Sequence, residues 1–361
     1  FQPWKKEIFL RRRIKANKRL CPDIYLDVVP ITQKNNDFEL HGDGKVVDYA
    51  VKMKEFPQEK IMTKQLEKEE IDEEILNKIC DILNDFYKTS ECSKEIDIYG
   101  GNETIKQNTN ENFVQTESVV DIAISKEIFD YIKKVTNQFL DLKKDDFEKR
   151  IKNGFIRDCH GDLHSGNIVV SNKDVFIFDC IEFNKRFRYA DVASDIGFLA
   201  MDLDFQARPF QSSYLIDSYV EKSGDKDIYD VLNFYKCYRA YVRGKVIGFK
   251  LNDPHIDKKE KKDTILTASK YFELAYYYAK LFECDLAETK PLLFITSGLT
   301  GTGKTTVARK ISIDYNTHLI STDEVRKELE GINKFERHHD AYNTGLYSPE
   351  KMLYTYEKAM E

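Results

Sequence analysis

Apolar side chains recur at three- and four-residue steps in the middle of the chain, which is the period of one face of a helix. They run from Ile124 through Phe139 to Leu142. Helical patterns also cover residues 4–20 and 59–87, and residues 193–282 with short interruptions. The pattern therefore predicts a largely helical protein with one clearly amphipathic helix at its centre.

Runs rich in β-branched and aromatic residues predict a smaller number of strands. Residues 24–32 and 45–53 read as two strands around the polar turn at 41–44, and residues 168–170 and 175–178 as a short hairpin. The Asn-rich stretch at 100–112 reads as a surface loop, and Gly154 suits a helix C-cap. Mixed helices and hairpins of this kind indicate an α+β fold.

A second pattern begins near residue 289. Residues 292–296 predict a buried strand, residues 306–314 a helix, residues 318–320 a short strand and residues 349–360 a helix. Strands that alternate with helices are typical of a parallel α/β sheet. We therefore expect two domains, residues 1–288 and residues 289–361.

The first domain contains a loop of the kind that supports phosphoryl transfer. His160, Asp162 and Asn167 match the H-x-D-x-x-x-x-N spacing of kinase catalytic loops. In such loops an Asp accepts the proton of the acceptor hydroxyl, and an Asn five residues later holds Mg²⁺. Asp179 follows the predicted hairpin, twelve residues after Asn167, and supplies the second carboxylate that this chemistry needs.

Two other interpretations of this loop remain. His160, Asp162 and His164 form an H-x-D-x-H pattern, which occurs in transition-metal sites, although no His or Cys cluster nearby completes four ligands. The loop could also match by coincidence, but the hairpin and Asp179 in the required places argue against that.

The segments around this loop resemble the aminoglycoside phosphotransferase-like family of protein-kinase-like enzymes. The likeness rests on residues 160–167, 177–184 and 188–203, extends from about residue 20 to about residue 285, and is greatest for a branch fused to a P-loop kinase domain. It implies that Asp162 is the catalytic base and that Asn167 and Asp179 bind Mg²⁺. It further implies that His160 and Asp195 support the loop, although Asp195 could instead be a surface charge on a helix.

The likeness also implies groups that are missing here. The glycine-rich hairpin and its phosphate-binding Lys would precede Phe1, and the place of their helical Glu partner is taken by the basic Arg11–Arg13. Lys52 resembles that Lys but follows the first helix, so we expect it to face solvent. Because the chain begins at Phe1 and stops within a helical pattern, we expect it to be a piece of a longer protein with an incomplete N-lobe.

The second domain opens on a Walker A pattern. Gly298, Gly303, Lys304 and Thr305 have the required spacing, between a predicted strand and a predicted helix. The loop's backbone N–H groups converge on phosphates, Lys304 reaches the β- and γ-phosphates, and Thr305 binds Mg²⁺. The nucleotide-binding residues are thus expected to be Gly298, Gly301, Thr302, Gly303, Lys304, Thr305 and Thr306.

A D-x-x-R segment, Asp323 to Arg326, follows the next predicted strand. This arrangement is similar to P-loop kinases of the polynucleotide-kinase and zeta-toxin type. The likeness implies that Asp323 activates an acceptor hydroxyl and that Arg326 binds the acceptor or its phosphate. Alternatively, Asp323 only caps a helix and Arg326 is solvated.

Composition restricts the partners. Charged residues make up 33% of the chain, but the net charge is −6, so a dedicated nucleic-acid binder is not expected. Seven scattered cysteines without a C-x-x-C pair read as reduced thiols of a cytoplasmic protein, and no apolar run is long enough to cross a membrane.

Taken together, these features predict an ATP- and Mg²⁺-dependent phosphotransferase that acts on the hydroxyl of a small-molecule acceptor and carries a second, P-loop nucleotide site. The alternative is a non-catalytic kinase-like module attached to an active P-loop ATPase or kinase. A nucleic-acid end kinase that acts through Asp323 is a third possibility.

Overall fold

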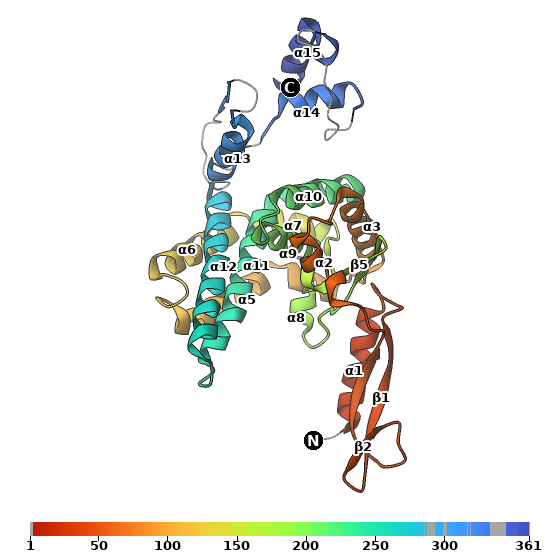
Figure 1. Ribbon diagram of the computed structural model, residues 1–361. Coiled ribbons are helices and arrows are strands. Elements are labelled where there is room, and N and C mark those ends of the chain that lie inside the picture. Colours follow the sequence, from red (N-terminus) through yellow and green to blue (C-terminus); the bar gives the residue numbers. More distant parts are fainter. Residues whose placement is uncertain are drawn as a thin grey trace. The chain divides into compact units, whose positions relative to one another are not determined.

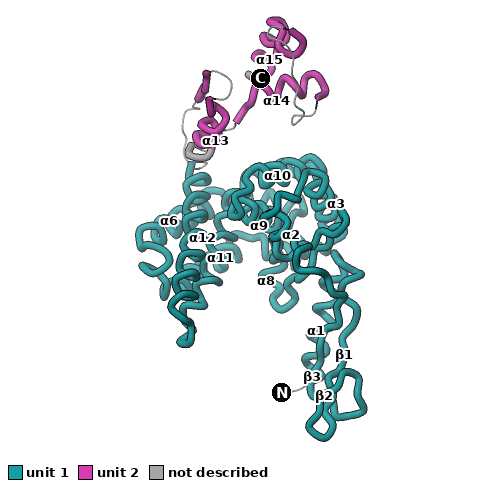
Figure 2. Tube along the Cα trace, in the orientation of Figure 1, with its two compact units in different colours: residues 1–286 teal, residues 287–361 magenta. Residues whose placement is uncertain are grey.

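The computed structural model describes residues 3–284, 286, 293–298, 302–315, 317, 319–332 and 344–360. The chain divides into two compact units, residues 1–286 and residues 287–361, shown in different colours in Figure 2. The division falls two residues before the domain boundary expected at residue 288. The first unit combines many helices with small antiparallel sheets, so it is α+β.

The first unit begins with a helix packed on a three-stranded antiparallel sheet of order β2-β1-β3 (Figure 1). Its elements are α1 (Pro3–Asn17), β1 (Tyr25–Lys34), β2 (Asp37–Leu40) and β3 (Lys45–Met53). Asn35 and Asn36 both have positive φ, 50° and 72°, as the tight turn of a two-residue hairpin requires. β2 was not predicted, because all four of its residues are exposed and leave no pattern of burial. Lys52 is exposed, as expected.

The rest of the first unit is a helical body around one large core. Figure 1 shows α11 and α12 lying side by side, and α9 also packs against α11. Every residue of α9 from Val192 to Leu203 is buried, so this helix runs through the centre of the unit. The helices of the body are α2 (Met62–Glu67), α3 (Glu73–Thr89), α4 (Lys94–Asp97), α5 (Asn102–Thr116), α6 (Lys126–Leu142), α7 (Lys144–Lys152), α8 (Lys185–Arg188), α9 (Val192–Phe205), α10 (Pro209–Ser223), α11 (Tyr229–Gly248) and α12 (Lys258–Cys284).

Two small antiparallel sheets lie in this body. β4 (Ile156–Asp158) pairs with β7 (Tyr189–Asp191). β5 (Ile168–Ser171) pairs with β6 (Asp174–Ile177), and Ile168 lies opposite Ile177. The predicted hairpin is therefore confirmed, with its second strand ending one residue early. The loop of residues 160–167 connects β4 to β5, and Asp179 follows β6.

The prediction of a surface loop at residues 100–112 is wrong, since most of this stretch belongs to α5. Its buried positions, among them Ile105, Asn112 and Phe113, recur at helical spacing and pack against α6 and α11. Asn102 Nδ2 donates a hydrogen bond of 2.7 Å to the carbonyl of Leu140. Tertiary packing thus overrides the low helix propensity of an Asn-rich sequence.

In the second unit, the helices predicted at residues 306–314 and 349–360 are found as α13 (Lys304–Tyr315) and α15 (Pro349–Met360), and a further helix, α14 (Thr322–Leu329), lies between them in the chain. The predicted strands are not, as far as the structure describes those segments: residues 293–296 and 319–320 pair with no neighbouring strand. Leu293 and Ile295, expected to be buried, are 77% and 78% exposed. A strand is stable only when its N–H and C=O groups find a ladder partner, and the described part of this unit contains none.

None of the described helices combines the length and apolar character that a membrane span requires. The structure joins none of the seven cysteines in a disulfide.

Candidate functional site

The loop after β4 is organised around the imidazole of His160, which is completely buried. Its Nδ1 accepts a hydrogen bond of 3.2 Å from the backbone N–H of Asp162, and its Nε2 lies 2.8 Å from the carbonyl oxygen of Phe178. Since Nδ1 is the acceptor, Nε2 carries the proton and donates to Phe178. Burial lowers the pKa of His160, which keeps the ring neutral. The ring therefore ties the loop to the end of the β5–β6 hairpin.

Asp195 of α9 holds the same loop by its backbone. Its Oδ2 accepts from the N–H of His160 at 2.7 Å and its Oδ1 from the N–H of Gly161 at 2.9 Å. The Tyr87 hydroxyl donates to Oδ2 at 3.2 Å. Asp195 is completely buried, so the alternative of a surface charge is wrong. Charge-assisted bonds to two successive N–H groups fix the loop's position more firmly than neutral ones.

Gly161 is required where the loop turns. Its φ is +88°, and a Cβ here would lie 2.8 Å from the carbonyl oxygen of Phe187. On the other side of this peptide, Arg239 of α11 donates from Nη1 to the carbonyl of Gly161 at 2.8 Å and from Nε to the Ser194 hydroxyl at 3.0 Å. Two buried helices thus hold the residue before Asp162.

Asp162 and Asn167 are in direct contact. Nδ2 of Asn167 donates to the Asp162 carbonyl at 2.9 Å and to its Oδ2 at 3.1 Å. Burial on its own raises the pKa of Asp162, but the hydrogen bond with His164, whose Nε2 lies 3.6 Å from Oδ2, and the nearby guanidinium of Arg239 outweigh it and lower the pKa to about 2. Asp162 is therefore an ionised carboxylate at neutral pH, able to accept a hydrogen bond or a proton.

Asp179 lies at the end of the hairpin and takes a left-handed backbone conformation, with φ +64°. Its N–H donates to the Tyr25 hydroxyl at 3.2 Å. Its Oδ1 accepts from Nη2 of Arg13 at 2.5 Å, and Nε of Arg13 lies 3.9 Å from Glu182. Burial raises the pKa of Glu182. The basic helix noted in the sequence therefore reaches the second carboxylate of the site.

Asp162 and Asp179 line one cavity of about 430 Å³. The three predicted site residues are thus only partly brought together. Asn167 forms a hydrogen bond with Asp162, whereas Asp179 is bonded to Arg13 instead. Two carboxylates and an amide are oxygen donors of the type that Mg²⁺ takes. However, among the described residues no three His, Cys, Asp or Glu side chains converge on one point. The donor types fit Mg²⁺, but a metal at Asp179 has to compete with the guanidinium.

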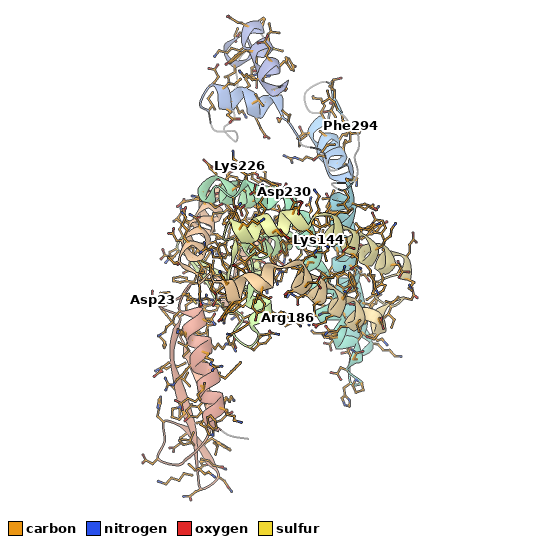
Figure 3. The ribbon with its side chains drawn as sticks, turned by 180° about the vertical axis from the view of Figure 1, so that it is seen from behind. Asp23, Lys144, Arg186, Lys226, Asp230 and Phe294 are labelled. Carbon is orange, nitrogen blue, oxygen red and sulfur yellow. The ribbon has the colours of Figure 1, made fainter. Side chains whose placement is uncertain are left out.

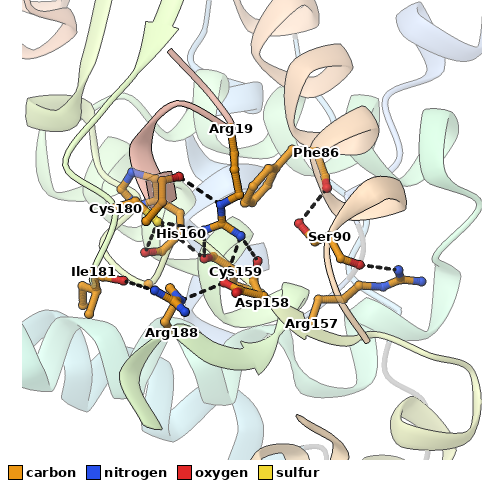
Figure 4. A network of polar contacts seen from close by, with 12 residues as sticks. Arg19, Phe86, Ser90, Arg157, Asp158, Cys159, His160, Cys180, Ile181 and Arg188 are labelled. Atoms are coloured by element: carbon orange, nitrogen blue, oxygen red, sulfur yellow. Dashed lines mark hydrogen bonds and ion pairs between the residues drawn. The ribbon is translucent and has the colours of Figure 1, made fainter. Parts of the chain in front are cut away.

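Two more arginines, Arg19 and Arg188, hold the segments that flank the site (Figure 4). Arg19 donates from Nη1 to the carbonyl of Asp158 at 3.0 Å and from Nη2 to Sγ of Cys180 at 3.2 Å. Oδ1 of Asp158 forms ion pairs with Arg19 at 2.9 Å and Arg188 at 2.8 Å. These contacts join the end of α1, the start of the loop and the segment after Asp179.

Sequence reasoning missed Arg239 and a second supporting carboxylate. Oδ2 of Asp202, also on α9, accepts from the backbone N–H of Ser165 at 2.9 Å. Asp195 and Asp202 lie seven residues apart on the same face of a mostly apolar helix. That spacing was the available signal, because two carboxylates on one face of a mostly apolar helix need partners when the helix is buried.

At the Walker A pattern, two glycines among the described residues have positive φ angles. Gly298 has φ +151° and Gly303 φ +84°, and Lys304 begins α13. Thr305 and Thr306 lie exposed in its first turn, and Thr302 is also exposed. Gly301 lies outside the described residues. Free N–H groups in the first turn of a helix favour an anion there.

Asp323 and Arg326 lie together on α14, with Oδ1 of Asp323 3.4 Å from Nη1 of Arg326. The helix is capped by Ser321, whose hydroxyl accepts from the N–H of Glu324, so the interpretation of Asp323 as the cap is wrong. Arg326 is buried against the Tyr347 ring rather than solvated. Asp323 also lies 3.0 Å from Nζ of Lys327.

No protein-family model matches the chain. It is 26% identical over 349 residues to an uncharacterised protein of Mycobacterium bovis and to uncharacterised proteins of two strains of Mycobacterium tuberculosis. The matches cover 97% of this chain and 66% of each relative, so the chain spans just under two thirds of their length. The function has to be argued from the site.

Proposed function

We propose that the first unit is a kinase-like phosphotransferase that moves the γ-phosphoryl group of ATP to a hydroxyl of a small-molecule acceptor. The observation that carries the proposal is the ionised Asp162, bonded to Asn167 and held in a cavity that it shares with Asp179. The chain is proposed to be cytoplasmic and to act without a membrane partner, with a small molecule favoured over nucleic acid as its acceptor.

In the proposed reaction, Oδ of Asp162 accepts the proton of the acceptor hydroxyl as its oxygen attacks the γ-phosphorus. The new O–P bond forms as the bond between the γ-phosphorus and the β,γ-bridging oxygen breaks, and ADP leaves. Asp195 and Arg239 do not touch the acceptor; they hold the backbone from which Asp162 projects. Mg²⁺, when bound by Asn167 and Asp179, would neutralise charge on the phosphates.

We also propose that the second unit binds nucleoside triphosphate through Lys304, Thr305 and the loop that precedes them, and that Asp323 and Arg326 serve its acceptor. The left-handed Gly303 just before Lys304 supports this assignment, because a phosphate-binding loop needs such a conformation.

The substitution Asp162→Asn in the complete protein tests the first proposal. It should abolish ATP-dependent transfer, screened against sugars, nucleosides, aminoglycosides and RNA ends, and leave nucleotide binding at the second unit intact. Asp174→Asn, an exposed carboxylate on β6, is the matched control. Transfer that continues in the Asp162→Asn protein would show that this carboxylate is not the base.

A second candidate function is supported by the contact of Arg13 with Asp179. If this ion pair persists with nucleotide present, the first unit acts as a binding or regulatory module and the P-loop unit alone turns over ATP. Transfer in the Asp162→Asn protein combined with loss of transfer in Lys304→Ala would favour this candidate.

A further inference from the structure

The cavity that contains Asp162 is lined by an apolar stripe of α11. Four residues of this helix reach the cavity at three- and four-residue steps and therefore share one helix face: Tyr235, Tyr238, Val242 and Val246. Tyr238 and Val242 are half-buried, and Val246 is 49% exposed. These side chains are therefore not used up by the core, and a ligand in the cavity can pack on them.

A second group of apolar side chains comes from the segment that follows Asp179. Its members in the cavity lining are Ile181, Phe183, Phe187 and Tyr189. The Tyr189 ring meets the Tyr99 ring edge-on, with the ring centres 5.3 Å apart. The Phe183 ring lies 6.4 Å from the Phe187 ring and is 65% exposed. Rings in both groups favour a ligand with a ring of its own, because aromatic pairs add to the gain from burial.

Charged residues of the lining are bound by partners within the protein. Arg186 of α8, labelled in Figure 3, binds both carboxylate oxygens of Glu111 on α5. Asp191 pairs with the buried guanidinium of Arg150. Since each of these charges already meets an opposite charge, neither Arg186 nor Asp191 requires a charged ligand.

The cations that α11 contributes to the lining are likewise engaged. Arg239 lies 3.8 Å from Asp195 and donates to the carbonyl of the loop. Nζ of Lys245 donates to two amide side chains of α5. The guanidinium of Arg243 lies 5.7 Å from the centre of the Tyr271 ring on α12. Because successive residues of a helix are about 100° apart, Arg243 and Lys245 lie on either side of the apolar stripe.

Asp162 is the acidic group that the lining leaves available. Asp179 and Glu182 both lie beside Arg13. The Asp162 side chain is 36% exposed, and in the described part of the chain no Lys or Arg nitrogen lies within 4 Å of its carboxylate. A cavity of about 430 Å³ with apolar walls and few polar groups is typical of a site for a small organic molecule.

We infer that the acceptor is an uncharged molecule with an apolar ring system, which packs on Tyr238, Val242 and Phe187 while its hydroxyl meets Asp162. The inference rests on the proposed function, since it takes Asp162 as the reacting end. A catalytic base must lie beside the proton that it accepts, so the cavity is assigned to the acceptor rather than to the adenine of ATP. A charged acceptor is disfavoured, because its charge would be buried against apolar walls.

Equilibrium binding to the complete protein tests this inference without any turnover. Naphthylmethanol carries an apolar ring and a hydroxyl, naphthoate and naphthylmethylamine carry the same ring with a negative or a positive charge, and inositol carries hydroxyls without an apolar surface. Calorimetry should show naphthylmethanol bound about tenfold or more tightly than inositol, and about threefold or more tightly than either charged analogue. Naphthylmethanol that does not bind, or binds no more tightly than any one of the other three, overturns the inference.

Two substitutions then locate the ring. Val242→Asp puts a charge at the centre of the apolar stripe, and Tyr238→Ala removes a ring, so each should weaken naphthylmethanol binding about tenfold. Leu266→Asp on α12 and Tyr229→Ala on α11 are the matched controls, since these residues are 54% and 46% exposed and lie outside the lining. Unchanged affinity in the Val242→Asp protein overturns the inference, and if that protein does not fold, Tyr238→Ala decides alone.

Two further arms separate this inference from the proposed function. In a Lys304→Ala background, ADP should bind together with naphthylmethanol, whereas competitive displacement would make the cavity the adenine site and overturn the acceptor assignment. Naphthylmethanol binding that depends on Val242, with transfer unaffected by Asp162→Asn, would retain the apolar binding site and refute the proposed reaction. Transfer that requires Asp162 but proceeds only to sugars would retain the reaction and overturn this inference.

Discussion

Arg13 of α1 donates from Nη2 to Oδ1 of Asp179 at 2.5 Å, across 166 residues of sequence. Asp179 is the carboxylate proposed to bind Mg²⁺, so a guanidinium stands where a cation is expected. The Coulomb attraction of Asp179 acts against the cost of burying Arg13, and the pKa of Arg13 is raised overall. A metal ion that binds Asp179 therefore has to displace the Arg13 guanidinium, which weakens metal binding at this site.

Arg13→Gln should tighten divalent-cation binding at the first unit. Both side chains are more than a third exposed, so solvent screening limits the ion pair to about 1 kcal/mol, or roughly fivefold in affinity. Mn²⁺ titration with ADP, in a Lys304→Ala background that silences the second site, measures it. Arg12→Gln, an exposed neighbour on the same helix, is the control. An unchanged Mn²⁺ affinity would mean that Arg13 does not compete with the metal.

The loop around Asp162 could be predicted from sequence because its chemistry fixes the spacing of its residues. The contact of Arg13 could not, because two residues so far apart meet only where the end of α1 contacts the segment after β6, as in the hydrogen bond from the N–H of Cys180 to Asn17. At α5 the Asn-rich composition led to the wrong prediction of a surface loop, because it outweighed the two buried apolar residues Ile105 and Phe113. In the second unit, apolar Leu293 and Ile295 suggested a strand, but a strand depends on neighbours that a local pattern does not contain.

Asp195→Asn should lower kcat about a hundredfold and leave the KM for ATP nearly unchanged. The Asn side chain has one acceptor oxygen for the two N–H groups of His160 and Gly161. The loop therefore shifts, and the Asp162 carboxylate moves away from its position beside the acceptor hydroxyl. Steady-state kinetics separates the two parameters. Asp217→Asn, an exposed carboxylate on α10, is the control. A rise in KM at constant kcat would contradict a positioning role.

Lys304→Ala should remove nucleotide binding from the second unit and leave transfer by the first unit intact. Lys304 begins α13 directly after the left-handed Gly303, where its ammonium is expected to meet the β- and γ-phosphates. The stoichiometry with which a fluorescent ATP analogue binds, measured with and without Asp162→Asn, gives the number of nucleotide sites in each variant. Arg309→Ala, exposed on the same helix, should leave both sites active. Loss of binding at both sites would show that the units are coupled.

Arg150→Met should destabilise the first unit by about 3–5 kcal/mol. The guanidinium is almost completely buried and binds Asp191 through Nε and Nη2 and Asp225 through Nη1 and Nη2. Its removal leaves two buried carboxylates without a counter-charge. Urea denaturation measures the loss, and the exposed Lys149→Met should cost far less. Similar midpoints for the two variants would show that the buried triad contributes little.

His160 should make the protein less stable as the pH falls through about 6.5, the ordinary pKa of a histidine. Burial lowers the folded-state pKa, so below pH 6.5 the unfolded chain binds a proton that the folded chain does not. The free energy of unfolding therefore falls by up to about 1.4 kcal/mol per pH unit until the folded-state pKa is reached. His160→Gln should remove this slope from urea denaturation curves, whereas exposed His255→Gln should not. The same slope in wild type and His160→Gln would show that the buried ring accepts a proton.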